Sequence, residues 1–228
     1  MKAMLLAAGR GERLRPLTDR LPKPLVPVGG KPLIAWHLER LAKAGCREVV
    51  ANVSHLADQI VDYVGDGQRF GLRVRFSREA EPLETAGGIA QALPLLGGEP
   101  FLLVNGDIYC AVDFAPLLSR RLGASLAHLV LVPNPPHRAD GDFTLEDGLI
   151  GNEGRARYTY AGVAVMSPRL VEPVKRGDKA PLAPLLRSAA AKRLISGEVF
   201  PGLWQDVGTA ERLAELEQQL ASGYKFAP

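Results

Sequence analysis

One segment near the start of the chain, residues 7–28, constrains the fold more than any other. It follows a short apolar run, Lys2 to Leu6, which predicts a buried first strand. The segment reads AAGRGERLRPLTDRLPKPLVPV and combines arginines and a lysine with two glycines and several prolines. Glycines let backbone N–H groups approach an anion closely, and Arg13 and Lys23 can add charge-assisted hydrogen bonds. A loop of this kind after a strand is typical of a phosphate-binding site.

The loop differs from the two best-known phosphate-binding motifs. After Gly9 and Gly11, the position of the third glycine in a dinucleotide-binding fingerprint holds Leu14. No Gly-Lys-Ser/Thr follows at the spacing of a P-loop. An oxidoreductase with a Rossmann cofactor site and a P-loop ATPase are therefore both disfavoured.

The whole segment resembles the signature of the sugar-1-phosphate nucleotidyltransferases, the enzymes that make nucleotide sugars. That signature reads GxGxRLxPLT followed by PKPLxPV. The matching positions are Gly9, Gly11, Arg13, Leu14, Pro16, Leu17, Thr18, Pro22, Lys23, Pro24, Leu25, Pro27 and Val28. The resemblance implies an α/β fold: a Rossmann-like, doubly wound, mostly parallel sheet flanked by helices, with a small inserted substrate-facing lobe, as in GT-A-like nucleotidyltransferases.

Strand and helix patterns alternate along the chain, as expected for such a sheet. We expect strands at 49–53, 72–76, 101–104, 126–132, 158–165 and 203–207, and helices at 32–44, 56–64, 86–95, 113–122, 181–193 and 210–220, the last capped by Thr209. Between residues 133 and 154 the periodicity gives way to Pro, Gly, Asp and Asn. We therefore predict one nucleotidyltransferase domain over residues 1–228, with residues 133–165 as a sugar-binding lobe and no C-terminal β-helix domain.

Composition limits the partners and the cellular location that we expect for the protein. The formal net charge is only +3 and basic residues form no long runs, which disfavours a nucleic-acid partner. No apolar stretch is long enough for a membrane span and no signal peptide is recognisable, so we expect a cytoplasmic protein that does not bind membranes. Cys46 and Cys110 are expected to be buried thiols, and the four histidines to be surface or packing residues. We expect a monomer.

Two aspartates are candidate metal ligands. Nucleotidyl transfer brings two anions together, so fixed cations and a divalent metal must offset their repulsion. Mg²⁺ prefers one or two carboxylates and fills its remaining positions with water and phosphate oxygens. Asp107 ends the run FLLVNGD and Asp206 lies in LWQDVGT. These strings match the Gly-Asp and Asp-Val-Gly-Thr motifs that supply the family's two metal ligands, so the resemblance implies Mg²⁺ at Asp107 and Asp206.

The resemblance also assigns roles to other residues. It implies that Arg13, Lys23 and Asp107 are catalytic, with Lys23 on the α-phosphate and Arg13 on the leaving pyrophosphate. The nucleotide-binding set that it implies comprises Leu6, Ala7, Ala8, Gly9, Gly11, Glu12, Arg13, Lys23, Glu81 and Gly87. The sugar-binding set comprises Asn105, Gly141, Glu153 and Gly162.

Two positions depart from the family pattern. Glu84 stands where the family commonly has Gly in its base-binding loop, and Thr85 beside it is also a candidate helix cap. The Glu-Lys-Pro string that places a lysine on the sugar phosphate in many relatives is absent. Arg155 or Arg157 is a candidate replacement for that lysine, unless Lys23 and the metal hold the phosphate alone.

The motifs are most similar to those of a subfamily that joins UTP to N-acetylmuramate 1-phosphate during cell-wall recycling. Its substrates would be a nucleoside triphosphate and a sugar 1-phosphate. The carboxylate of such a sugar needs a nearby cation, for which Arg138, Arg155 and Arg157 are candidates. Alternatives are a mannose-1-phosphate guanylyltransferase, a glucose-1-phosphate thymidylyltransferase or a non-catalytic nucleotide-sugar sensor.

Overall fold

A computed structural model describes residues 1–222 of the chain. The helices are α1 (Leu33–Lys43), α2 (Ala57–Val64), α3 (Glu84–Leu96), α4 (Phe114–Ser119), α5 (Ala183–Ala191) and α6 (Ala210–Ala221). The strands are β1 (Lys2–Leu6), β2 (Pro27–Val28), β3 (Lys31–Pro32), β4 (Glu48–Val53), β5 (Arg73–Arg78), β6 (Phe101–Asn105), β7 (Ile108–Cys110), β8 (Ala127–Val132), β9 (Phe143–Glu146), β10 (Leu149–Gly151), β11 (Arg157–Met166), β12 (Ile195–Val199) and β13 (Trp204–Asp206).

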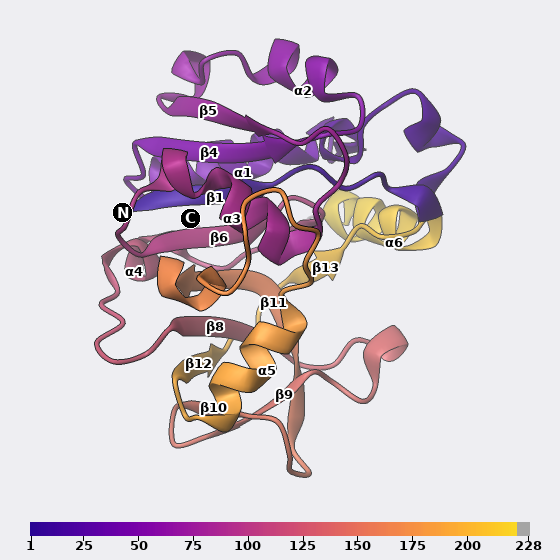
Figure 1. The fold of residues 1–228 in the computed structure, drawn as a ribbon. Helices are drawn as coiled ribbons and strands as arrows, with labels where there is room; N and C mark the ends of the chain where they lie inside the picture. Colours follow the sequence, from indigo (N-terminus) through magenta and orange to yellow (C-terminus); the bar gives the residue numbers. More distant parts are fainter. Residues whose placement is uncertain (223–228) are drawn as a thin grey trace.

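The main sheet has two halves with different pairing. Within residues 1–222 it has nine strands in the order β5-β4-β1-β6-β11-β8-β12-β10-β9 (Figure 1). From β5 to β6 all neighbours are parallel, whereas β11 is antiparallel to both β6 and β8, and β10 to both β12 and β9. The expected α/β class is confirmed. The expected mostly parallel pairing is found in the first half of the sheet. In the second half, β11 and β10 run antiparallel to their neighbours.

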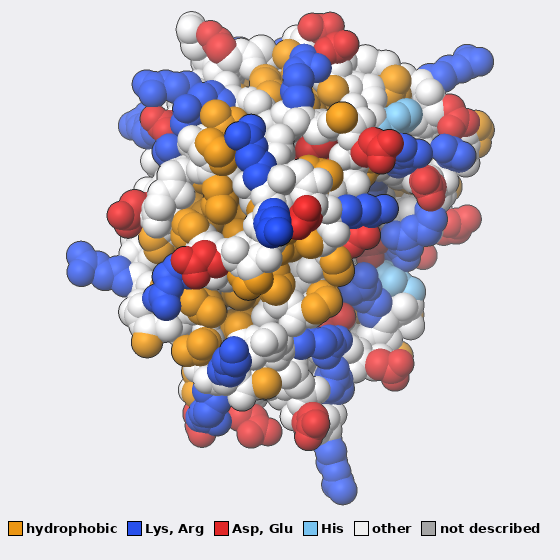
Figure 2. Space-filling model, viewed as in Figure 1, with side chains coloured by type: hydrophobic (Ala, Val, Ile, Leu, Met, Phe, Trp, Pro, Cys, Tyr) orange, Lys and Arg blue, Asp and Glu red, His pale blue; other side chains and the backbone are white. Residues whose placement is uncertain are grey.

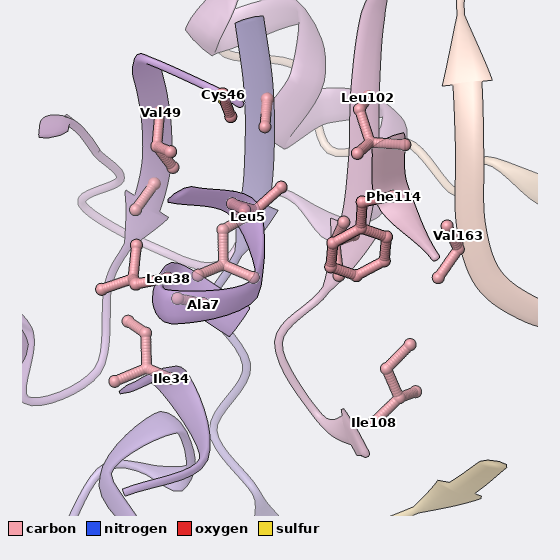
Figure 3. Close-up of a cluster of buried hydrophobic side chains, with 14 of the residues drawn as sticks. Leu5, Ala7, Ile34, Leu38, Cys46, Val49, Leu102, Ile108, Phe114 and Val163 are labelled. Carbon is pink, nitrogen blue, oxygen red and sulfur yellow. The ribbon is translucent and has the colours of Figure 1, made fainter. Parts of the chain in front are cut away.

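Two cores cover the two faces of this sheet, because successive side chains of a strand point to opposite faces. Leu5 of β1 packs in a cluster with Ile34 and Leu38 of α1 and Phe114 of α4 (Figure 3). Met4, the preceding residue, lies in the other cluster, which includes side chains of α3 and α5. Helices on both faces thus hold β1 and β6 rigidly, with their carboxyl ends free to carry a site.

A small second sheet joins the end of the chain to its middle. Strand β13 pairs with β7, and Asp206 lies opposite Ile108 in this pairing. Helix α6 follows directly, and its Leu216 packs with Tyr109 of β7 and Val207 in a third buried cluster. These contacts place α6 beside the loop that follows β1 (Figure 1).

Most predicted elements are confirmed to within a few residues, including the first strand and the last helix. Thr209 is the N-cap of α6, as predicted, and its hydroxyl accepts a hydrogen bond from the N–H of Arg212. Helix α4 is shorter than the predicted 113–122. The segment 133–154, predicted as irregular, contains the β9–β10 hairpin, and β7 and β12 were not predicted. Both cysteines are buried free thiols, as expected.

His37 of α1 makes the stability of this fold sensitive to acid. Burial, and secondarily the nearby Arg40, lowers the pKa of His37 to about 4. The unfolded chain therefore takes up a proton at this residue near its ordinary pKa of 6.5, before the folded chain does. Stability from this residue is fully present above that value and is lost as the pH falls toward 4.

We predict that the free energy of unfolding falls by about 2 to 3 kcal/mol between pH 7 and pH 4.5 through this residue. Urea unfolding at both pH values measures the loss, and His37→Gln, which keeps a donor but does not titrate, should reduce it by that amount. Burial also lowers the pKa of His128, so the comparison of the two proteins isolates His37. Equal pH dependence in the wild type and the variant would contradict the prediction.

Candidate active site

The loop after β1 is held in shape by its own motif residues. Gly11 has a φ of 67°, in the region that favours glycine, and its carbonyl accepts a hydrogen bond from Thr18 Oγ1 at 2.8 Å. Thr18 is buried, and a side chain on Gly11 would meet it and Lys23. The 3₁₀ helix η3 (Lys23–Leu25) then directs the largely buried Lys23 inward. The spacing of Gly11, Thr18 and Lys23 in the motif thus corresponds to direct contacts among these three residues.

Lys23 meets the first candidate metal ligand. Its Nζ lies 2.8 Å from Asp107 Oδ2, and the Asp107 side chain remains 44% exposed. Gly106, just before it, donates its N–H to the Leu6 carbonyl, and a side chain there would collide with that oxygen. The turn after β6 is therefore pressed against the end of β1, and it presents Asp107 to Lys23.

Strand β13 brings the second aspartate to the same place. The N–H of Val207 donates to the Asp107 carbonyl at 2.8 Å, so the two aspartates sit on adjacent, hydrogen-bonded segments. A methyl group on Gly208 would lie 2.6 Å from Asp206 Oδ1 and 3.0 Å from an Arg13 guanidinium nitrogen. The structure thus gathers Arg13, Lys23, Asp107 and Asp206, as the sequence predicted.

Asp206 has two side-chain neighbours that the sequence did not point to. Arg212 of α6 contacts Oδ1 at 2.8 Å, and His137 Nε2 lies 2.7 Å from Oδ2. His137 is exposed, in agreement with the expectation of a surface residue, and its contact with Asp206 is a feature that the sequence did not predict. It comes from the 3₁₀ helix η5 (Pro136–Arg138), whose position depends on long-range packing that no local pattern indicates.

These groups lie in a two-part cleft. One cavity of about 810 Å³ lies over the loop after β1, and another of about 480 Å³ lies between β11, α5 and the β9 region. Both are lined by Arg13, Glu84, Thr85, Asn105 and Asp107. Basic and acidic side chains alternate on the right-hand side of Figure 2, where Figure 1 shows this loop and α6. Two ligands bound in these cavities would meet at Asp107.

The larger cavity contains nearly the whole nucleotide-binding set. Its lining includes Leu6, Ala7, Ala8, Gly9, Gly11, Glu12, Arg13, Lys23 and Glu81. Gly87 is outside both linings. Its N–H donates to the Ala180 carbonyl, and a side chain there would collide with the backbone at Asp178, so Gly87 lets α3 pack against the 178–180 segment.

A buried polar chain supports the floor of this cavity. The Ala7 N–H donates to Asn52 Oδ1 at 2.8 Å, and Asn52 Nδ2 donates to Glu79 Oε1 at 2.7 Å. The other Glu79 oxygen accepts the N–H of Leu83. The loop after β1 and the start of α3 are thereby tied to β4. Sequence analysis missed both side chains, because a single Asn or Glu at a strand end gives no distinctive signal.

Glu84 begins α3 with a φ of 60°, a conformation uncommon for a residue with a side chain. The family's Gly at this position suits such backbone, and here Glu84 adopts it while its side chain lines both cavities. Thr85 does not cap α3, because the helix already begins at Glu84. The N-cap position is Leu83, which makes no side-chain capping hydrogen bond. The helix-cap interpretation of Thr85 was therefore wrong.

The sugar-binding set is divided. Asn105 and Gly162 line the smaller cavity, and Gly162, with a φ of 74°, packs directly on the Asn105 side chain. Gly141 and Glu153 are outside its lining: Gly141 packs on Asn134, and Glu153 is exposed, its carbonyl accepting a hydrogen bond from Thr144.

The two arginines considered for the sugar phosphate are not in the cleft. Arg155 is exposed and outside both linings. Arg157 donates to the carbonyls of Asp140, Asn152 and Asp142, so its guanidinium holds the lobe together. Neither residue takes the place of the family's lysine in this structure.

Comparison with known proteins agrees with this site. The chain matches the family model described as Nucleotidyl transferase over residues 2–143. It is 51% identical to the N-acetylmuramate alpha-1-phosphate uridylyltransferase of Neisseria meningitidis serogroup B, over 99% of this chain and 100% of the relative. It is 32% identical to the mannose-1-phosphate guanylyltransferase catalytic subunit beta of Drosophila pseudoobscura pseudoobscura, over 91% of this chain and 59% of that relative.

The fold has close structural neighbours. A candidate glucose-1-phosphate thymidylyltransferase from Bacillus anthracis, solved with sucrose, superimposes with a TM-score of 0.86 at 20% identity, covering 100% of this chain and 98% of its own. The chain belongs to the nucleotidyl transferase family, and within it to the sugar-1-phosphate nucleotidyltransferases, which act on nucleoside triphosphates and sugar 1-phosphates. Within residues 1–222, no helix is long and apolar enough to cross a bilayer.

The Asn52 hydrogen bonds generate a stability prediction. Asn52→Ala leaves the Ala7 N–H without its partner and removes one of the two hydrogen bonds to the buried Glu79 carboxylate, so the free energy of unfolding should fall by about 1 to 3 kcal/mol. Urea unfolding at neutral pH measures the change. Gln59→Ala removes an exposed side-chain hydrogen bond to the Arg20 carbonyl and serves as the control, with an expected change within about 0.5 kcal/mol. Similar losses in both variants would contradict the role given to Asn52.

Proposed function

We propose that this protein transfers the uridylyl group of UTP to N-acetylmuramate α-1-phosphate, giving UDP-N-acetylmuramate and pyrophosphate. One observation carries the proposal: Lys23 lines the larger cavity, Asp206 lines the smaller one, and Asp107 lines both. The full-length identity of 51% to a relative named for this reaction supports the choice of substrates. The activity would serve cell-wall recycling in the cytoplasm.

The bond changes follow from the placement of the two anions. An oxygen of the sugar phosphate forms a bond to the α-phosphorus of UTP, and the bond from that phosphorus to the β-phosphate oxygen breaks, releasing pyrophosphate. The sugar phosphate is already ionised near neutral pH, so no general base is needed. Lys23 would offset charge at the α-phosphate, while Arg13 and the backbone of Gly9 to Gly11 would hold the pyrophosphate.

The aspartates suit a magnesium ion. Among residues 1–222, no group of three or more His, Cys, Asp and Glu side chains is arranged to hold a metal. Asp107 and Asp206 alone provide what Mg²⁺ requires, because it accepts one or two carboxylates and takes its other ligands from water and phosphates. When bound, the ion would offset the negative charge of the reacting phosphates.

The two cavities divide the substrates between them. The nucleotide would lie over the loop after β1, and the sugar would lie in the smaller cavity beside Asn105 and Gly162. The lobe at residues 133–165 contributes Arg138, Asp142 and Tyr160 to that cavity, so we propose it as the sugar-facing part of one nucleotidyltransferase domain. Residues of one chain line both cavities, and we propose that a monomer is sufficient for activity.

A pyrophosphate-release assay tests the proposed reaction. UTP, GTP, dTTP and CTP are each combined with the 1-phosphates of N-acetylmuramate, N-acetylglucosamine, mannose and glucose. We expect kcat/KM to be highest for UTP with N-acetylmuramate 1-phosphate. A preference for GTP with mannose 1-phosphate, or for dTTP with glucose 1-phosphate, would contradict the proposal, as would Mg²⁺-dependent binding of UTP with no product.

Substitutions in the charge cluster should affect turnover more than folding. We expect Lys23→Ala, Asp107→Ala and Asp206→Ala each to lower kcat/KM by about 100-fold or more, because each removes charge compensation between the phosphates. Pyrophosphate release measured across Mg²⁺ concentrations reports the effect. Asp19→Ala removes a carboxylate from an exposed ion pair with Arg15 and is the control. Near-normal turnover of the three site variants would refute the assigned roles.

A further inference from the structure

The smaller cavity extends beyond the aspartates to a wall formed by α5 and β9. Leu182, Leu186 and Arg187 line it from the α5 side, and Phe143 lines it from β9. The three apolar side chains are buried. This wall therefore combines a hydrophobic surface with one cationic group.

Arg187 is the cation of this wall that has no acidic partner. Its guanidinium carbon lies 5.3 Å from the centre of the Phe143 ring, and Nη1 is 3.5 Å from the Asp142 carbonyl, at the outer limit of a hydrogen bond. Within residues 1–222, no carboxylate lies within 4.0 Å of it. Arg138, in contrast, is paired with Asp142 at 3.3 Å. The planar donor edge of Arg187 is thus more available to a ligand than that of Arg138, the other arginine on this side of the smaller cavity.

The backbone around Arg187 is fixed. The carbonyl of Arg187 accepts a hydrogen bond from Asn152 Nδ2 at 2.8 Å, which ties α5 to the β10 hairpin. Next to this wall, the Tyr160 hydroxyl is buried and has no hydrogen-bond partner among residues 1–222, and burial raises the pKa of Tyr160. A polar ligand in the cavity would therefore find a positioned cation, whereas the Tyr160 hydroxyl is covered.

We infer that Arg187 binds the carboxylate of the lactyl ether that distinguishes N-acetylmuramate from N-acetylglucosamine, and so determines which sugar is used. The inference rests on the proposed function. A guanidinium matches a carboxylate with two parallel hydrogen bonds, and the exposed side chain of Arg187 leaves its donors open to such a ligand. Phe143 and Leu182 give the lactyl methyl group an apolar surface. Arg187 thus replaces Arg155 and Arg157, which the structure places outside this cavity.

The test compares two substrates in each protein. We expect Arg187→Ala to lower kcat/KM for N-acetylmuramate 1-phosphate by about 10- to 100-fold, the effect of losing one charge-assisted interaction, and to leave kcat/KM for N-acetylglucosamine 1-phosphate within about twofold. Arg187→Lys should fall between, because it keeps the charge and loses the paired donors. Arg155→Ala, which removes an exposed arginine outside both cavities, is the matched control and should not change the ratio.

A modified substrate allows the protein and the sugar to be changed separately and together, as in a double-mutant cycle. N-acetylmuramate 1-phosphate with its carboxylate converted to a carboxamide should be used about as poorly by the wild type as the natural sugar is by Arg187→Ala, with little further loss when both changes are combined. Additive losses, or equal losses with both sugars in Arg187→Ala, would overturn the inference. A wild type that does not use N-acetylmuramate 1-phosphate would instead refute the proposed function, which separates the two failures.

Discussion

The pairing of β7 with β13 is the constraint on which the site depends. It places Asp107 and Asp206 on adjacent segments, and two carboxylates held this close repel each other unless cations are near. Lys23 supplies the compensation for Asp107 and Arg212 supplies it for Asp206, whose other carboxylate oxygen contacts His137 Nε2. Lys23, Arg212 and His137 come from three separate parts of the chain. The charge cluster therefore joins the loop after β1, the 3₁₀ helix η5 and the helix α6 into one unit.

The sequence was most informative where the site residues belong to motifs of consecutive residues. The loop from Gly9 to Lys23 and the motifs around Asp107 and Asp206 could be predicted, because local spacing fixes their backbone and their side chains meet at strand ends. His137 and Arg212 could not, since each acquires its role only when distant elements pack together. The same reason explains the missed strands: β9, β10 and β7 are short, and β12 contains Ser, Gly and Glu that only pairing with β8 makes a strand.

The family resemblance identified positions of the motifs, but it did not predict what every one of these residues contacts. The resemblance assigned Gly87 to the nucleotide and Gly141 to the sugar. In the structure both lie outside the cavities, where neighbouring backbone or side-chain atoms leave no room for a Cβ. Glu84 shows the converse, because a residue that departs from the pattern adopts a positive φ, which suits glycine, and adds a carboxylate to both cavities. Sequence alone could not separate these cases, since the difference lies in three-dimensional neighbours.

The position of α6 also has a consequence for biosynthesis. Asp206 and Arg212 come from the end of the described chain, whereas the loop that would hold the triphosphate forms near its beginning. A nascent polypeptide can fold β1 and its loop while these later residues are still inside the ribosome. Under the proposed function, the charge cluster would be complete only after β13 and α6 dock, so a chain still lacking them would have part of the nucleotide cavity and would not turn nucleotide over.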